Sequence, residues 1–177
     1  ASLRKSGRRA ADILPALRAL VKQEPSPLST VAVDDIVDDV LKILAPDLEA
    51  AGVTVAVVPG TGQHRIMANV TQLQQVFFNL ITNAVQAMAQ GADRRLRIVT
   101  SASPDSVDVA IEDSGCGMPQ EVIAGIFRPF FTTKKTGMGV GLAICRSIME
   151  LHGGSLDARS VEGQGSTFFV RLPRAQD

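Results

Sequence analysis

The sequence lacks an excess of charge of either sign, because its 18 Lys and Arg residues balance its 18 Asp and Glu residues. This balance excludes a bulk electrostatic field for nucleic acid or an anionic membrane, so any anion site has to be built locally. No apolar run approaches the length of a membrane span, and residues 1–5 lack the apolar core of a signal peptide. We expect a cytoplasmic domain that contacts neither membrane nor nucleic acid.

Other features are also scarce. Cys116 and Cys145 lack metal-ligand spacing, which fits a reducing compartment, and a bridge between them is not implied. The sequence has no internal repeat, no low-complexity tract and no initiating Met, so we expect an excised fragment whose upstream anchor or sensor domains are left open. Its 177 residues, 45% of them hydrophobic, suit one domain with a substantial core plus an appended helix.

The first segment favours that appended helix. Apolar residues recur at helical spacing from Leu3 to about Lys22, which predicts a helix in search of a partner helix. Pro15 implies either a kink or a second helix starting there. Pro25 and Pro27 predict a stiff linker. We therefore divide the chain into a helical segment at 1–24, a linker at 25–32 and a main domain at 33–177.

Within the main domain, hydrophobic periodicity separates helices from strands. The predicted helices span 34–51, 71–89, 120–126 and 143–152. The predicted strands span 53–58, 65–68, 95–103, 107–113, 155–160 and 167–172. Short turns join 95–103 to 107–113 and 155–160 to 167–172, so each of these pairs is expected to form an antiparallel hairpin.

A glycine-rich stretch at 137–142 immediately precedes the last predicted helix. Its alternating glycines let a polyanion approach the backbone, and the helix directs free amide groups and its positive dipole end at the same place. The pattern indicates a phosphate site. A flexible loop without a ligand has the same pattern.

Two polar features accompany it. Along the 71–89 helix, Gln72, Gln75, Asn79, Asn83 and Gln86 lie on one face at three- and four-residue spacing. The asparagines cost helix propensity, so this stripe is either a functional face or a solvated one.

The second polar feature is an acidic residue at the end of a predicted strand, Asp113, which is followed by Gly115 and Gly117. This arrangement is either a plain turn or a carboxylate at the mouth of a pocket. The segment 127–136 then holds Phe127, Phe130 and Phe131. Aromatic residues in a loop indicate docking, although burial in the core explains them equally well.

In order along the chain, these motifs resemble the ATP-site boxes of sensor histidine kinases. The resemblance covers about 33–173, and its most specific wording is similar to the subgroup that contains nitrogen-regulation and oxygen-sensing kinases. The motifs that carry it are 79–84, 113–117, 127–134, 137–142 and 165–167. The resemblance implies a Bergerat-type ATP-binding fold, shared with gyrase and mismatch-repair ATPases. This is an α/β two-layer fold with a mixed, mainly antiparallel sheet and helices on one face.

The resemblance also implies roles. Asn83 would bind Mg²⁺ through its carboxamide oxygen, with Asn79 assisting at the metal or the phosphates. Asp113 would accept a hydrogen bond from the adenine amino group, with Thr167 supporting Asp113 or the base. The remaining residues would cradle the base or close over the triphosphate of ATP: Gly115, Gly117, Thr132, Thr133, Lys134, Gly137, Gly139, Val140, Gly141 and Leu142.

Two departures limit the expected activity. Asn79 stands where ATP-hydrolysing relatives have a glutamate, and a carboxamide cannot act as a general base, so direct hydrolysis should be slow. Neither His64 nor His152 has the context of a phosphoacceptor, and we interpret His152 as a helix-end residue favoured by the helix dipole. The fragment is thus expected to hold no catalytic side chain of its own.

The leading hypothesis is the catalytic domain of a protein-histidine kinase. It would bind Mg-ATP and present the γ-phosphate to a histidine on a separate dimerisation and phosphotransfer domain, for relay to the receiver domain of a response regulator. The full-length protein would be a homodimer, and residues 1–24 would be the end of its helical hairpin. The alternative is a nucleotide-sensing module without phosphotransfer, and a gyrase-type ATPase is disfavoured by Asn79.

Overall fold

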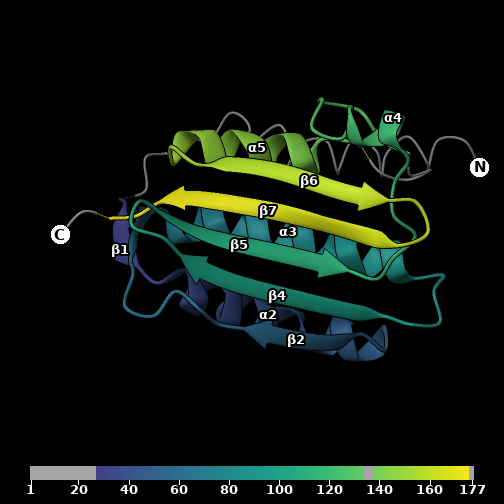
Figure 1. The fold of residues 1–177 in the computed structure, drawn as a ribbon, viewed down its shortest axis with the longest axis horizontal. Coiled ribbons are helices and arrows are strands. Elements are labelled where there is room, and N and C mark those ends of the chain that lie inside the picture. Colours follow the sequence, from purple (N-terminus) through teal and green to yellow (C-terminus); the bar gives the residue numbers. More distant parts are fainter. Residues whose placement is uncertain (1–26, 134–137, 176–177) are drawn as a thin grey trace, which may run out of the picture.

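The computed structural model describes residues 27–133 and 138–175. Five strands form one sheet in the order β2-β4-β5-β7-β6, in which β2 runs parallel to β4 and the other neighbours are antiparallel. These strands are β2 (Thr54–Val58), β4 (Arg95–Ala102), β5 (Ser106–Asp113), β6 (Ser155–Val161) and β7 (Gly165–Pro173). Figure 1 shows the helices α2 (Val33–Ala50), α3 (Val70–Met88) and α5 (Gly141–Leu151) behind one face of this sheet. The short α4 (Gln120–Ile123) lies at the β6 side.

The central helix α3 forms where the apolar spacing predicts it. Its core-facing side chains, among them Leu73, Phe77 and Leu80, are fully buried. The side chain of Asn69 caps its first turn by accepting a hydrogen bond from the Gln72 N–H (3.1 Å). The N-cap therefore sets where the helix begins, and the buried side chains set which of its faces packs against the core.

The strands alternate as a half-covered sheet requires. In β5 every second residue from Val107 to Asp113 is buried under the helices, and the residues between them face away. In β7, Ser166 shares its face with Phe168, Val170 and Leu172, all of which are buried. This alternation decides which side chains at the strand ends can reach a site under the helices.

The predicted linker at 25–32 differs from the structure at its end. Residues 29–31 form the strand β1 (Ser29–Val31), which pairs antiparallel with β3 (Ile66–Ala68). Pro25 and Pro27 favoured a linker over this whole segment, and a strand of three residues is too short for its alternation of side chains to be recognised in the sequence. The predicted helix within 1–24 lies outside the described residues. None of the helices in the described part of the chain is long and apolar enough to cross a membrane.

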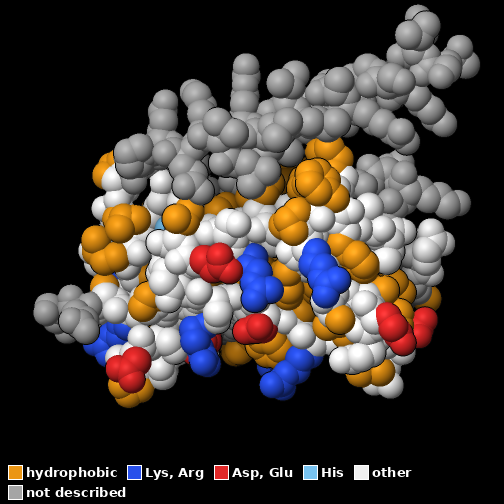
Figure 2. Space-filling view, turned by 90° about the horizontal axis from the view of Figure 1, so that it is seen from above, with side chains coloured by type: hydrophobic (Ala, Val, Ile, Leu, Met, Phe, Trp, Pro, Cys, Tyr) orange, Lys and Arg blue, Asp and Glu red, His pale blue; other side chains and the backbone are white. Residues whose placement is uncertain are grey.

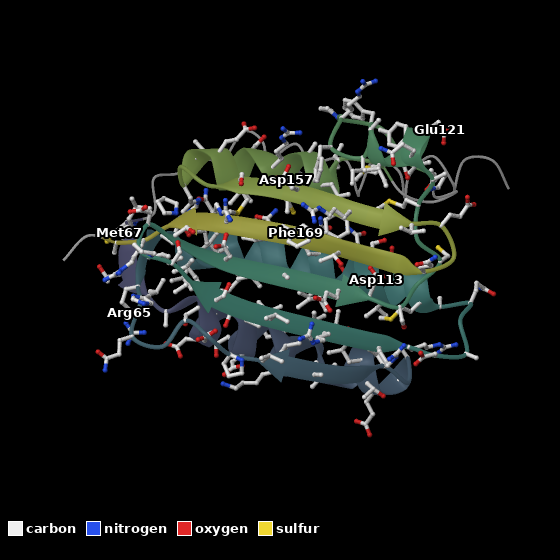
Figure 3. The ribbon with its side chains drawn as sticks, in the orientation of Figure 1. Arg65, Met67, Asp113, Glu121, Asp157 and Phe169 are labelled. Carbon is white, nitrogen blue, oxygen red and sulfur yellow. The ribbon has the colours of Figure 1, made fainter. Side chains whose placement is uncertain are left out.

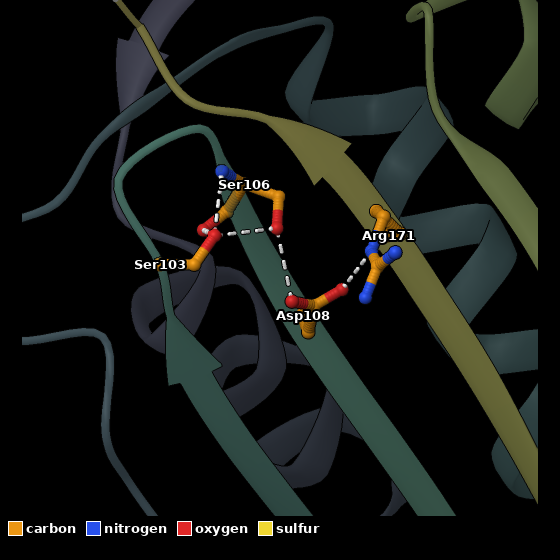
Figure 4. Close-up of polar contacts among 4 residues, drawn as sticks. All are labelled: Ser103, Ser106, Asp108 and Arg171. Carbon is orange, nitrogen blue, oxygen red and sulfur yellow. Dashed lines mark hydrogen bonds and ion pairs between the residues drawn. The ribbon is translucent and has the colours of Figure 1, made fainter.

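The other face of the sheet carries polar and charged side chains held in cross-strand pairs. The guanidinium of Arg171 on β7 contacts the Asp108 carboxylate on β5 (2.6 Å), and the Ser106 hydroxyl donates to the same carboxylate (3.0 Å; Figure 4). Arg97 pairs with Glu112 in the same way (2.9 Å). Figure 2, seen from the β6 and α5 side, shows basic and acidic side chains interspersed without a patch of one sign. The side that Figure 2 shows, where no grey atoms cover it, therefore offers no strong attraction for a polyanion.

Candidate functional site

Asp113 ends β5 beneath the helices, where the residue is only 8% exposed (Figure 3). Its carboxylate accepts a hydrogen bond from the Gly115 N–H (2.8 Å). Burial raises the pKa of this carboxyl group above its usual value, while hydrogen bonds from the backbone of Gly115 and Ser166 act in the opposite direction. A buried carboxylate at a strand end can select a ligand by accepting a hydrogen bond from it.

The loop that follows Asp113 is fastened on two sides. On one side the Cys116 N–H donates to the Ala87 carbonyl of α3 (3.1 Å). On the other side the Gly163 N–H, in the turn between β6 and β7, donates to the Cys116 carbonyl (2.7 Å). Gly117 has a φ of +65°, and a Cβ there would overlap the carbonyl oxygen of Val161. The loop thus passes between helix and turn through a gap that only glycine fits at this position.

The residue beside Asp113 is Ser166, not the predicted Thr167. Ser166 is the direct cross-strand partner of Asp113, and it is 7% exposed on the same, helix-covered face. Thr167 pairs with Glu112 and points to the opposite face. The prediction that Thr167 supports Asp113 is wrong by one residue, and in a strand one residue changes the face.

Sequence reasoning also missed Ser160. This residue of β6 is the cross-strand partner of Ser166. Its hydroxyl accepts a hydrogen bond from the Met118 N–H (2.7 Å), donates to the Gly165 carbonyl (2.8 Å) and lies 2.9 Å from the Ser166 hydroxyl. Strand parity was an available signal for Ser166, which alternates with Val170 and Leu172 on the inner face of β7, but no local pattern singles out Ser160.

Asn79 and Asn83 lie one turn apart on α3, both half-buried. The Asn79 amide donates to the thiol of Cys145 on α5 (3.2 Å). A Cβ at Gly141 would come within 2.8 Å of the Asn79 Oδ1 atom, so a side chain there would have to displace the Asn79 amide. The polar stripe on α3 therefore faces the start of α5 at Asn79.

The predicted helix after the glycines is α5, which begins at Gly141 with Val140 as its N-cap. No side chain caps this end, in contrast to the start of α3. Its first-turn amide groups and dipole therefore favour an anion in front of Gly141. Val140 and Leu142 pack against the core, so these two residues would contribute backbone groups to a ligand. Gly139 adopts a φ of +68° beside Phe131.

The predicted lid is described only in part. Thr132 and Thr133 are exposed, whereas Lys134 and Gly137 lie outside the described residues. Phe127 and Phe131 pack against the core, while Phe130 has a φ of +65° and is 76% exposed. Burial in the core, one of the two alternatives predicted for these phenylalanines, therefore explains Phe127 and Phe131 but not Phe130.

His152 and the two cysteines have definite environments. His152 ends α5, as predicted, but its Nε2 accepts a hydrogen bond from the Asn69 N–H (3.0 Å) and its Nδ1–H donates to the Ile148 carbonyl (2.7 Å). Both ring nitrogens are thus hydrogen-bonded to the backbone, and these two contacts hold the side chain at the helix end. Cys116 is an exposed free thiol. Cys145 is a buried free thiol, and burial raises its pKa to about 11.

Comparison with known proteins decides the family. Residues 68–176 match the family described as histidine kinase-, DNA gyrase B- and HSP90-like ATPases. The chain belongs to this family. The resemblance to this family that the motifs predicted is therefore confirmed.

Two curated relatives carry sensor names: one is named a sensor histidine kinase and the other a sensor protein. The chain is 37% identical over 93% of its length to the sensor histidine kinase TmoS of Ectopseudomonas mendocina. It is 46% identical over 66% of its length to the sensor protein FixL of Bradyrhizobium diazoefficiens. The chain spans 17% of the length of TmoS and 23% of that of FixL.

Among solved structures of these ATPases, the nucleotide-free catalytic domain of the histidine kinase ThkA superposes with a TM-score of 0.75 at 29% identity. The likeness covers 84% of this chain and 96% of that one. This match confirms the predicted two-layer fold with a mixed sheet.

Proposed function

We propose that this chain is the ATP-binding catalytic domain of a sensor protein-histidine kinase, which binds Mg-ATP and presents the γ-phosphate to a histidine on a separate dimerisation domain. The observation that carries the proposal is the joint placement of two features under one face of the sheet. A buried acceptor, Asp113, lies at one end, and an uncapped helix start at Gly141 faces the polar stripe of α3. An adenine nucleotide needs both.

The base end is built from rigid parts. Asp113 would accept a hydrogen bond from the adenine amino group, and Gly115 and Gly117 would let the base lie against the backbone of the fastened loop. A guanine carbonyl in the same place would set two acceptors against each other. The buried carboxylate thus supplies the base preference.

The phosphate end is built from α3 and α5. The carboxamide oxygen of Asn83 is a hard ligand that would hold Mg²⁺, and the ion would supply charge neutralisation at the phosphates. The described residues contain no group of three or more His, Cys, Asp or Glu side chains that could hold a metal, so this donor set fits an ion that the nucleotide's phosphates help to hold. Asn79 would lie at the phosphates or the metal shell.

These groups position the phosphates and balance their charge. The chain would supply the remaining cradle from the amide groups at the start of α5 and from the predicted lid residues Thr132, Thr133, Lys134, Gly137 and Gly139. The N–H groups of the first turn of α5 need an acceptor, which phosphate oxygens provide. Asn79 has no basic atom to activate water, so the bound nucleotide would be kept for transfer. The acceptor histidine, the homodimer and the response-regulator receiver domain would belong to the full-length protein.

Calorimetric titration tests the proposal. We expect this chain to bind a non-hydrolysable ATP analogue more tightly with Mg²⁺ than without it, and to bind the GTP equivalent at least about tenfold more weakly. Asn83→Asp and Asp113→Asn should weaken binding of the ATP analogue while circular dichroism remains unchanged. Ser155→Ala, an exposed change on β6, is the control and should bind normally.

Normal affinity for the ATP analogue in both site variants would contradict the assigned roles. If the analogue binds but a supplied dimerisation domain carrying the acceptor histidine gains no phosphate from ATP, the kinase part of the proposal fails and nucleotide binding alone remains.

A further inference from the structure

Three side chains form a polar row across the end of the sheet. Asp113 on β5, Ser166 on β7 and Ser160 on β6 are successive cross-strand partners, so they share the helix-covered face. The loop at Met118 closes the row, because its N–H donates to the Ser160 hydroxyl (2.7 Å). The row therefore joins the buried carboxylate to the fastened loop.

The hydrogen bonds of Ser160 can be assigned from the chemistry of its partners. A serine hydroxyl has one proton and two lone pairs. The Gly165 carbonyl can only accept, so it takes the Ser160 proton (2.8 Å), and the Met118 N–H can only donate, so it occupies one lone pair. The second lone pair is left for the Ser166 hydroxyl at 2.9 Å, which must then donate.

This assignment determines what Ser166 can offer a ligand. Its only hydroxyl proton is directed at Ser160, so the outward side of its oxygen carries lone pairs alone. Asp113 next to it is also an acceptor and already receives a hydrogen bond from the Gly115 N–H (2.8 Å). Both side chains at the base end therefore offer a ligand only hydrogen-bond acceptors.

We propose that Ser160 is a positioning residue for base recognition: by taking the Ser166 proton, it makes the base-binding edge an acceptor-only surface. This edge favours a purine with an exocyclic amino group and rejects one with a carbonyl there. The inference rests on the proposed function and deepens it, because it assigns part of the selectivity to a residue that need not touch the base.

The two purines that test this differ at the exocyclic group and at the adjacent N1 atom, which accepts a hydrogen bond in adenine and carries a proton in inosine, so the test compares each compound between variants of the chain. Inosine nucleotides have a carbonyl where adenine nucleotides have an amino group. In the unchanged chain the inosine carbonyl meets only acceptors and loses its hydrogen bond to water, which costs more than a neutral contact. In Ser160→Ala the Ser166 hydroxyl is free to rotate and can donate to that carbonyl.

The experiment is calorimetric titration of the chain with non-hydrolysable ATP and ITP analogues. We expect the unchanged chain to prefer the adenine compound at least about tenfold. Ser160→Ala should reduce this preference about three- to tenfold through a gain in affinity for the inosine compound. Ser160→Thr, which keeps the hydroxyl, and Ser155→Ala, an exposed change on the same strand, should leave the preference within about twofold.

A gain in affinity for the inosine compound distinguishes a positioning role of Ser160 from structural damage, because a disordered loop would lower the affinity for both compounds equally. Equal loss for both in Ser160→Ala overturns the inference and leaves the proposed function standing. If that variant does not fold, Ser166→Ala serves instead: it should weaken the adenine compound without strengthening the inosine compound, and an unchanged preference overturns the inference. Failure of the unchanged chain to bind either compound overturns both.

Discussion

At the residue scale, the proposed contact between the buried Asp113 and adenine would make nucleotide binding sensitive to acid. Burial raises the pKa of its carboxyl group, so the group takes up a proton at a higher pH than an exposed Asp would. A protonated carboxyl group accepts an amino hydrogen bond poorly. We therefore expect the affinity for an adenine nucleotide to fall as the pH is lowered towards the raised pKa, measured by titration from pH 8 to the onset of acid unfolding. In Asp113→Asn this part of the pH dependence should disappear, and an unchanged profile would contradict the contact.

The same residue has an opposite effect on stability. A folded-state pKa above the unfolded value means that the native protein binds more protons in the window between the two. The favourable contribution is thus complete below the ordinary pKa of Asp and is lost as the pH rises through the raised value. Lowering the pH should therefore increase the contribution of Asp113 to the free energy of unfolding while it decreases the affinity for nucleotide. Urea unfolding without nucleotide, measured across the same pH range, separates the two effects.

The site residues show how far the sequence could lead. The types and order of residues at Asn79, Asn83 and Asp113 were visible as motifs, because their spacing is local. Ser166 was missed in favour of Thr167, since both can donate and accept and only strand parity separates them. Ser160 could not be identified, because its importance arises from partners on the 115–119 loop and on β7 that no local pattern reveals.

At the scale of elements, His152 joins the end of α5 to the start of α3. Replacing it by Ala would leave the N–H of the buried Asn69 without its acceptor. We expect His152→Ala to lower the free energy of unfolding by about 1–3 kcal/mol, measured by urea denaturation. Ser147→Ala, an exposed change on the same helix, should stay within about 0.5 kcal/mol. Equal stability of the two variants would show that the bond carries no weight.

Elements with long periodic patterns were predicted to within a few residues, because burial on one face imposes the pattern. α3 was expected at 71–89 and spans Val70–Met88, and β5 was expected at 107–113 and spans Ser106–Asp113. Contacts between distant elements escaped prediction. Asp34 at the start of α2 accepts hydrogen bonds from the buried Thr61 and from Thr100 on β4 (2.5 Å for Thr100), and nothing local to Asp34 signals either partner.

At the scale of the whole molecule, one core between sheet and helices supports both ends of the site. Phe77 is fully buried in this core, whereas its neighbour Phe78 is 43% exposed. Phe77→Ala should lower the free energy of unfolding by about 3–5 kcal/mol, since it removes a large buried side chain and leaves a cavity. Phe78→Ala is the matched control and should cost less than about 1.5 kcal/mol in the same denaturation experiment. Similar losses would contradict the burial assigned to α3.

The sheet itself divides along the chain. β4 with β5 and β6 with β7 are hairpins of neighbouring segments, and the sheet joins them where β5 pairs with β7. The row of Asp113, Ser166 and Ser160 crosses this seam. Each hairpin alone holds only part of the base-binding edge, so a chain with its two halves unjoined has no complete recognition surface. Under the proposed function, a nucleotide bound there would contact both hairpins and shift the folding equilibrium towards the joined state by mass action.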